Sequence, residues 1–250
     1  MLKDISIGQY YRTESVIHGL DARTKLAITL IYAISVFICD NIYMYAFAGL
    51  FLAVYVALSN VPLLHIIKGT RFIWIFLIVM ALFNLFNGGV IQAVFVVLKL
   101  LLLVMGSSIL TYTTLPMNMT DGLEHIFGFL KVFHVPVAEM AMMITIAIRF
   151  IPIIMEEMEK IKKAQIARGA DFESGNVIKR IKCYMAVFIP LFVSAIGRAT
   201  DLAQAMDARC YQGGKGRTRL RELKYHLPDG IAYGIIVLYF AAIIVLRIWL

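Results

Sequence analysis

The chain has 250 residues, of which 61% are hydrophobic and only 16% are charged, and its mean hydropathy is +0.82. A water-soluble globule of this size could not bury so much apolar surface, so the composition predicts an all-α integral membrane protein. The net charge of +8 does not indicate a nucleic-acid partner, because 16 of the 24 Lys and Arg residues share the stretch 112–230 with 12 of the 16 acidic residues. A charge-rich stretch of this kind fits the cytoplasmic face of a membrane protein.

Five apolar segments are expected to cross the bilayer, at 26–39, 42–58, 72–86, 90–110 and 231–250. The last two have roughly the 20 residues that a crossing requires, whereas the first three are shorter. The turns near Asp40 and at 87–89 carry no Lys or Arg and are expected outside, and the loop with His65, Lys68 and Arg71 is expected inside. With a cytoplasmic N-terminal segment, this predicts a multi-pass protein whose C-terminus lies outside.

Two basic residues stand apart from this plan. Lys99 lies deep within the fourth segment, where an ionisable residue is a functional candidate because its burial costs several kcal/mol. The alternative is that its ammonium reaches the surface or pairs with Asn84 or Gln92. Arg247, close to the end of the last segment, disfavours an external C-terminus unless its long side chain reaches the membrane surface.

Three helices of a different kind are expected between the fourth and last spans. A short amphipathic helix is predicted for 120–133, with Thr120 opening it as an N-cap. Longer helices are predicted for 137–169 and 176–211, each with an apolar part followed by polar turns. Pro152 and Pro190 are expected to bend these two helices.

No residue pattern indicates nucleotide hydrolysis or metal chemistry. The run 213–216 (Gly-Gly-Lys-Gly) lacks the spacing of a phosphate-binding loop. The five histidines are dispersed, and Cys39, Cys183 and Cys210 are too scattered for a disulfide framework or a zinc site. We therefore expect no cofactor, no metal and no catalytic residue, so that a separate subunit would have to supply any energy. The basic stretch 213–226 is expected to be a cytoplasmic flank, with a partner contact as the alternative.

The most informative pattern is a short phrase that occurs twice, near the ends of the two long helices. In each copy small residues flank an arginine: Ala167, Arg168 and Gly169 in the first, and Ala208, Arg209 and Cys210 in the second. Each copy follows a Phe-Ile-Pro step, with Pro152 16 residues before Arg168 and Pro190 19 residues before Arg209. The difference of three residues is close to one helical turn, so both arginines can lie on equivalent faces.

A single arginine near a helix C-terminus often does no more than complement the helix dipole. Two arginines in the same sequence frame favour a docking role instead. The guanidinium is a flat fork of donors that a carboxylate accepts bidentately, which lysine cannot reproduce. Small neighbours would let each helix end approach another surface closely.

With these motifs the chain resembles the transmembrane coupling subunit, or T component, of energy-coupling-factor transporters, which are vitamin- and metal-importing relatives of ABC transporters. The paired arginine motifs carry the resemblance, and the segments 8–11, 17–25, 149–152 and 217–219 support it. Two positions depart from the family pattern, since Ala22 stands where proline is usual and Cys210 stands where glycine is usual. We therefore expect the second long helix to end differently from the first.

The resemblance implies a bacterial cell-membrane location, no nucleic-acid partner, and a complex of several subunits. Two cytoplasmic ABC-type ATPases would bind the arginine ends, and a membrane S component that carries the substrate would pack on the apolar parts of the long helices. The implied S-component contacts are Met140, Met143, Ala147, Met185 and Phe188. By role, the chain would divide into membrane helices at 1–111, a coupling region at 112–230 and a last span at 231–250.

Three other interpretations remain open at this point. A self-contained secondary transporter would carry polar residues at the membrane midplane in broken helices. A membrane-embedded enzyme would need clustered His, Asp or Glu at a membrane face. A scaffold without a transport role differs from these only in an uptake assay.

Overall fold

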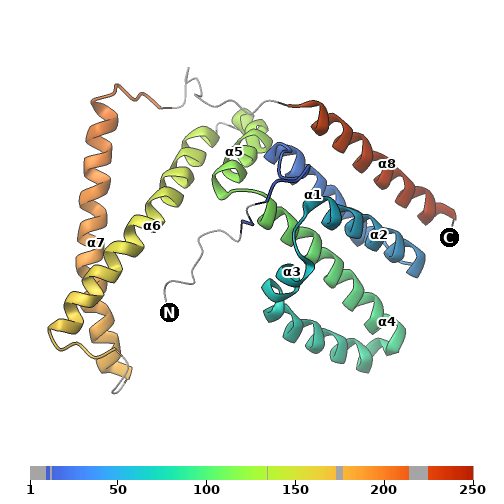
Figure 1. The fold of residues 1–250 in the computed structure, drawn as a ribbon, viewed down its shortest axis with the longest axis horizontal. Helices are drawn as coiled ribbons and strands as arrows, with labels where there is room; N and C mark the ends of the chain where they lie inside the picture. Colours follow the sequence, from blue (N-terminus) through green and yellow to red (C-terminus); the bar gives the residue numbers. More distant parts are fainter. Residues whose placement is uncertain (1–9, 12, 134, 173–176, 214–224, 250) are drawn as a thin grey trace. The chain divides into compact units, whose positions relative to one another are not determined.

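The computed structural model describes residues 10–11, 13–133, 135–172, 177–213 and 225–249. All regular structure in these residues is helical, which confirms the expected all-α fold (Figure 1). The elements in chain order are α1 (Ala22–Ile38), α2 (Ile42–Ser59), α3 (Leu63–Gly69), α4 (Arg71–Thr113), α5 (Pro116–Ile126), the 3-10 helix η1 (Phe127–Phe133), α6 (Val137–Ala167), α7 (Val177–Asp207) and α8 (Leu227–Trp249).

The chain forms two compact units. One comprises Met1–Phe129 and Leu220–Leu250 and holds α1 to α5 together with α8, and the other comprises Leu130–Arg219 and holds α6 and α7. These units are defined by packing and do not show what each part of the chain does. The functional division at residues 111 and 230 therefore stays a prediction.

Five helical stretches among the described residues are long and apolar enough to cross a membrane: Ile42–Ser59, Gly88–Thr113, Val137–Ala167, Arg180–Asp207 and Leu227–Trp249. The number agrees with the sequence prediction, but the membership differs. The spans predicted at 26–39 and 72–86 correspond to shorter helices, namely α1 with 17 residues and the apolar stretch Ile73–Phe86. The long helices α6 and α7 are also candidate spans, because each contains an apolar stretch that is long enough to cross a membrane. Length and hydropathy therefore do not separate spanning helices from the two long helices in this chain.

The predicted turn at 87–89 is confirmed as a break within α4. Gly89 has φ 80° and ψ 176°, a conformation outside the helical region that residues with a Cβ rarely adopt. The ribbon of α4 doubles back at this point (Figure 1). Helix α3, in contrast, was not predicted, because seven residues are too few to show a helical period.

The amphipathic helix predicted for 120–133 starts earlier than expected and changes type. Helix α5 begins at Pro116, whose fixed φ suits the first helical position, with the extended residue Leu115 before it. Thr120 is not an N-cap, since its hydroxyl lies inside the helix and donates to the Pro116 carbonyl at 2.9 Å. From Phe127 the chain continues as a 3-10 helix to Phe133.

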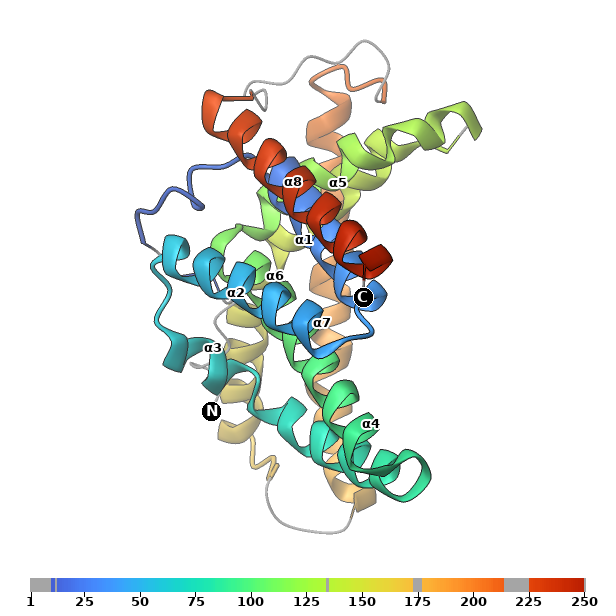
Figure 2. The ribbon, with the colours of Figure 1, turned by 90° about the vertical axis from the view of Figure 1, so that its right-hand side faces the viewer.

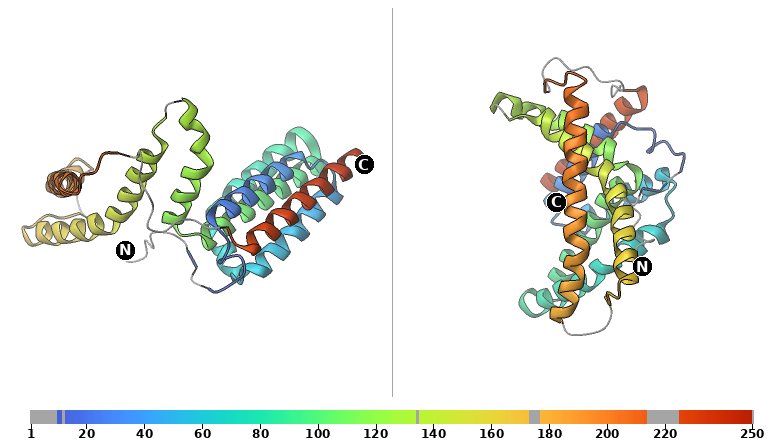
Figure 3. Two further views of the ribbon diagram at one scale, coloured as in Figure 1. Left: turned by 90° about the horizontal axis from the view of Figure 1, so that it is seen from above. Right: turned by 90° about the vertical axis from the view of Figure 1, so that its left-hand side faces the viewer.

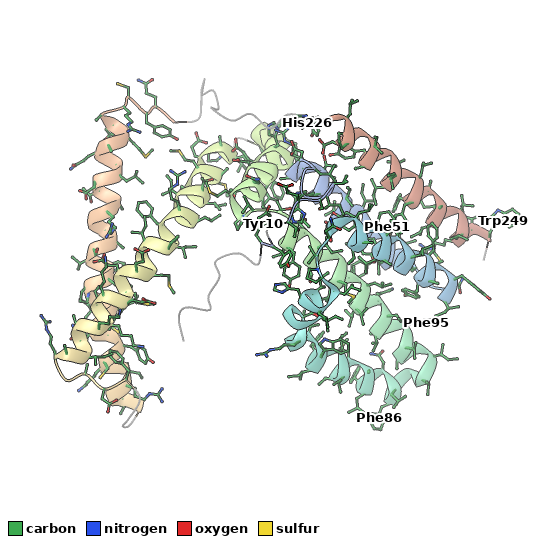
Figure 4. The ribbon with its side chains drawn as sticks, viewed as in Figure 1. Tyr10, Phe51, Phe86, Phe95, His226 and Trp249 are labelled. Carbon is green, nitrogen blue, oxygen red and sulfur yellow. The ribbon has the colours of Figure 1, made fainter. Side chains whose placement is uncertain are left out.

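Aromatic side chains hold the core of the first unit, where α1 packs against α4, α5 and α8 (Figure 2). The rings of Phe51 (labelled in Figure 4) and Tyr239 stack with centroids 4.1 Å apart, and the Tyr239 hydroxyl lies 2.9 Å from the Ser35 hydroxyl. A Cβ on Gly106 would lie 2.5 Å from Cε1 of Tyr32, so the missing side chain allows α1 and α4 to approach closely.

A buried polar network joins the starting ends of α1 and α8. One carboxylate oxygen of Asp229 accepts the backbone N–H of Asp21 at 2.9 Å, and the other accepts the N–H of His226 at 2.9 Å. Asp21 and His226 directly precede α1 and α8, so a single carboxylate with 1% exposure satisfies N–H groups at the starts of both helices. His226 is labelled at the start of α8 in Figure 4.

Lys25 extends this network to the end of α4. Its ammonium is 3% exposed and donates to the carbonyl oxygens of His18 at 3.1 Å and Thr113 at 3.0 Å. The N-terminal segment is held at the same place, because the N–H of Tyr11 donates to the Tyr112 carbonyl at 2.9 Å. The motif at 17–25 therefore has a structural role, as the junction of α1, α4 and α8.

The opposite ends of α1 and α8 are also held together. The guanidinium of Arg247 lies 3.5 Å from the carboxylate of Asp40, in the turn that follows α1. Lys99 donates to the Phe37 carbonyl in the last turn of α1 at 3.3 Å, so its partner is a helix-end carbonyl and not the expected Asn84 or Gln92. Helices α1 and α8 thus run in the same direction.

The buried ammonium of Lys25 makes stability depend on pH. Burial lowers the pKa of Lys25 from 10.5 to about 8, against the opposing pull of the carboxylates of Asp21 and Asp229. Between these two values the unfolded chain binds more protons than the folded one, so the free energy of unfolding should rise with pH through this interval, by up to roughly 3 kcal/mol. The melting temperature of the purified protein should therefore rise between pH 8 and 10.5 relative to that of Lys25→Arg, whose charge does not titrate there. Equal slopes for the two proteins would contradict this account.

Candidate functional site: two arginine-ended helices

Helices α6 and α7 pack against each other in opposite directions. The Gln165 side-chain amide on α6 donates to the Ala186 carbonyl of α7 at 3.3 Å, and Glu157 forms a 2.8 Å ion pair with Arg198. The two helices are therefore antiparallel, because residues with lower numbers on α6 contact residues with higher numbers on α7. Figure 1 shows the two helices crossing, and the right-hand view of Figure 3 shows α7 (orange) along its whole length beside α6 (yellow).

The first arginine closes α6 within a regular helix-ending motif. Arg168 is the C-cap residue of α6, and Gly169 follows it with φ +86°. The N–H of Gly169 donates to the Ile166 carbonyl at 2.9 Å, and that of Ala170 donates to the Gln165 carbonyl at 3.0 Å. These two bonds define a Schellman motif, which satisfies carbonyl groups at the end of the helix.

An aromatic anchor holds the chain that leaves this first helix end. Phe172 is buried, its ring centroid lies 5.6 Å from that of Tyr184 on α7, and the Lys162 ammonium lies 5.5 Å from it. The segment after Arg168 is thus fixed to both helices. The packing role of Phe172 could not be predicted from the sequence, because its partners lie on two different helices.

The second arginine lies in the same motif, which corrects the expectation that α7 would end differently. Cys210 has φ +55° and takes the place that Gly169 has in the first copy. Its N–H donates to the Asp207 carbonyl at 2.9 Å, and the N–H of Tyr211 donates to the Met206 carbonyl at 3.1 Å. The same two hydrogen bonds therefore end both helices, and they hold Cys210 in a backbone conformation that favours glycine.

Both arginine phrases face solvent in the unit to which they belong. Six residues are exposed at the two helix ends: Ala167, Arg168, Gly169, Ala208, Arg209 and Cys210. Within the described part of the chain, neither guanidinium makes a hydrogen bond or an ion pair. Both groups of donors are thus available to an acceptor outside this chain.

The two arginines lie toward opposite ends of the α6–α7 pair. Each helix has 31 residues, so each is about 46 Å long at 1.5 Å per residue. The chain after α7 returns toward the start of α6, because a Cβ on Gly213 would lie 3.6 Å from the Glu139 carboxylate. The pair therefore presents two widely spaced basic ends rather than one joint patch.

The five residues implied as S-component contacts are all exposed within this unit: Met140, Met143, Ala147, Met185 and Phe188. Met140, Met143 and Ala147 follow the three- and four-residue spacing of one face of α6. On α7, the ring of Phe188 stacks on that of Phe192 with centroids 6.0 Å apart. Both helices thus carry exposed apolar side chains.

No other grouping of chemistry-bearing side chains competes with these helix ends in the described residues. Within that part of the chain, no three His, Cys, Asp or Glu side chains are placed to hold a metal ion. Most of the basic stretch at 213–226 lies outside the described residues. The fold and these two exposed ends together define a multi-pass helical membrane protein with two exposed basic helix ends.

Comparison with known proteins agrees with this class. Residues 13–220 match a protein family described as CbiQ, cobalt transport protein. The chain is 43% identical to the energy-coupling factor transporter transmembrane protein EcfT of Clostridium kluyveri, covering 100% of this chain and 99% of the relative. It is 41% identical to EcfT of Bacillus subtilis, covering 92% and 93%, and 41% identical to EcfT 1 of Listeria monocytogenes, covering 99% of both.

The chain belongs to the EcfT/CbiQ family of transmembrane components of energy-coupling factor transporters. It is a multi-pass membrane protein and a non-catalytic subunit of such a transporter. The family membership agrees with the resemblance that the arginine motifs indicated.

The strained cap at Cys210 leads to a stability prediction. Cys210→Gly should stabilise the end of α7 by about 1 kcal/mol, because glycine adopts a positive φ without a Cβ clash. Gly169→Cys should destabilise the end of α6 by a similar amount, since open space surrounds a Cβ there and only the backbone conformation opposes it. Hydrogen exchange of the amides at 208–211 and 167–170 measures both effects. Faster exchange at 208–211 in Cys210→Gly would contradict this explanation.

Proposed function

We propose that this subunit couples two cytoplasmic ABC-type ATPases to a membrane S component that carries a vitamin or a metal ion. Membership of the energy-coupling factor family supports a place in a transporter complex. The observation that carries the proposal is that two arginines, free of partners in the described residues, end two oppositely directed helices in the same backbone motif.

Each arginine is suited to one ATPase subunit. A guanidinium at the end of a rigid helix supplies paired donors for a carboxylate, and the small residues beside it let the helix enter a groove. Because Arg168 and Arg209 have the same cap geometry, two related ATPases could each bind a helix end of the same shape. Their placement at opposite ends of the α6–α7 pair supports two separate docking grooves.

The apolar faces of the same helices are suited to a membrane partner. Met140, Met143 and Ala147 on α6, with Met185 and Phe188 on α7, would contact the S component. Methionine side chains adapt to differently shaped partners, although they also serve as ordinary core filling. A change in the distance between the ATPases would shift α6 against α7 and so change the surface that the S component meets. For this, the subunit must bind each ATPase state with different free energy.

Charge reversal at the helix ends tests the docking role. Arg168→Glu or Arg209→Glu should each weaken ATPase binding by about 2–5 kcal/mol, because a carboxylate in the groove would then face another carboxylate. Co-purification of the ATPases and substrate uptake should fall in each variant, and both should be abolished in the double variant.

Two control variants sharpen this experiment. Lys160→Glu reverses an exposed charge on α6 about two turns before Arg168 and should leave assembly unchanged. Arg168→Lys keeps the charge but loses the paired donors, so its effect should fall between those of wild type and Arg168→Glu. Complete assembly by the double Glu variant would refute the docking role.

A further inference from the structure

Pro190 removes a backbone donor from the middle of α7. In a helix the N–H of each residue donates to the carbonyl four residues earlier, and proline has no N–H. The carbonyl of Ala186 is therefore left without its intrahelical partner. An unsatisfied carbonyl at a packed helix surface is unfavourable, so a donor from elsewhere stabilises the helix.

Gln165 of α6 supplies that donor. Its side-chain amide lies 3.3 Å from the Ala186 carbonyl, and the bond is partly buried. Val187, the neighbour of Ala186, is buried, which places this bond in the contact between the two helices. The acceptor exists because residue 190 is proline, so the bond links a sequence feature of α7 to a side chain of α6.

Helices α6 and α7 differ in whether the carbonyl freed by their proline has a side-chain donor. Pro152 frees the Ile148 carbonyl of α6 in the same way, yet no side chain in the described residues donates to it. Met206 occupies in the second phrase the position that Gln165 has in the first, and a thioether has no donor. The cross-helix bond is thus a property of the first arginine end alone.

The position of Gln165 ties this bond to the arginine. Gln165 precedes Arg168 by three residues and lies beside it on the helix surface. On the other side of the crossing, Glu157 and Arg198 form their 2.8 Å ion pair. These two links enclose the place where α6 and α7 cross, so they resist rotation of one helix over the other.

We propose that Gln165 is a positioning residue that bonds the carbonyl freed by Pro190, sets the angle at which α6 crosses α7, and thereby sets the spacing of Arg168 and Arg209. The functional consequence rests on the proposed role of these arginines in ATPase docking, whereas the geometric consequence does not. Without the bond, α6 and α7 would retain their apolar contact but adopt a wider range of crossing angles.

The test measures the distance between the two arginine ends in the full-length protein in nanodiscs. Spin labels are attached to the native, exposed Cys210 and to an engineered cysteine at Ala167, with Cys183→Ser, while the buried Cys39 is retained. Pulsed electron paramagnetic resonance then gives the distance distribution. Gln165→Met should broaden or shift this distribution. Cys210 lies roughly 18 residues, or about 27 Å, beyond the middle of the crossing, so a rotation of about 10° moves that end sideways by about 5 Å and changes the distance between the labels by less.

A double-mutant comparison isolates the role of proline. Pro190→Ala restores the N–H that bonds the Ala186 carbonyl, so Gln165→Met should add little in that background. In the matched Pro152→Ala background the full effect of Gln165→Met should remain. An unchanged distribution in Gln165→Met, or an equal effect in the two proline backgrounds, would overturn the proposal.

Assembly and uptake separate this inference from the docking role. In the reconstituted transporter, Gln165→Met keeps both arginines, so the ATPases should still co-purify while uptake per ATP hydrolysed falls severalfold. If the double Glu variant of the arginines assembled normally, the docking role would fail, and the distance measurements would still decide the role of Gln165. Normal uptake per ATP with a changed distance would remove the coupling role and keep the geometric one.

Discussion

The constraint on which the rest of this structure depends is that backbone groups need hydrogen-bond partners in a chain that offers few polar side chains. Water is not available as a substitute inside a bilayer or a packed helix contact. Several of the polar side chains therefore bond to backbone groups at helix ends and at a proline. Asp229 accepts two N–H groups at the starts of α1 and α8, and Lys25 and Lys99 donate to helix-end carbonyls.

The same constraint explains both arginine ends. The carbonyl groups at the end of each long helix are satisfied by the backbone itself, through a residue with positive φ and the two bonds of a Schellman motif. Because the backbone provides this cap, the arginine side chains are not used for it and point outward. At Cys210 the motif forms in spite of an unfavourable backbone conformation, so the hydrogen bonds outweigh a local cost of about 1 kcal/mol.

In the role proposed for this subunit, the α6–α7 pair would transmit motion between partners through a change in the angle at which its two helices cross. Each helix is continuous apart from its proline, and the prolines remove donors within a few turns of the crossing. Of the two carbonyls that the prolines free, one is bonded across the crossing by Gln165. Helices that keep their shape while their crossing angle changes would move their ends by several ångströms, and the ends are where the arginines lie.

Much of this protein was predictable from local sequence, because helices and turns depend on neighbouring residues. The all-helical fold, the break at 87–89, the two long helices with their prolines and the paired arginine phrases are all visible in the sequence. Other features required the tertiary structure, because they join residues far apart in the chain. Lys99 finds its partner at the end of α1, Asp229 joins α8 to α1, and Gln165 reaches the carbonyl that Pro190 frees. The sequence by itself determined where the long helices form and where α4 breaks. Only the tertiary structure decided which helix ends meet, since hydrogen bonds between distant groups depend on packing in space.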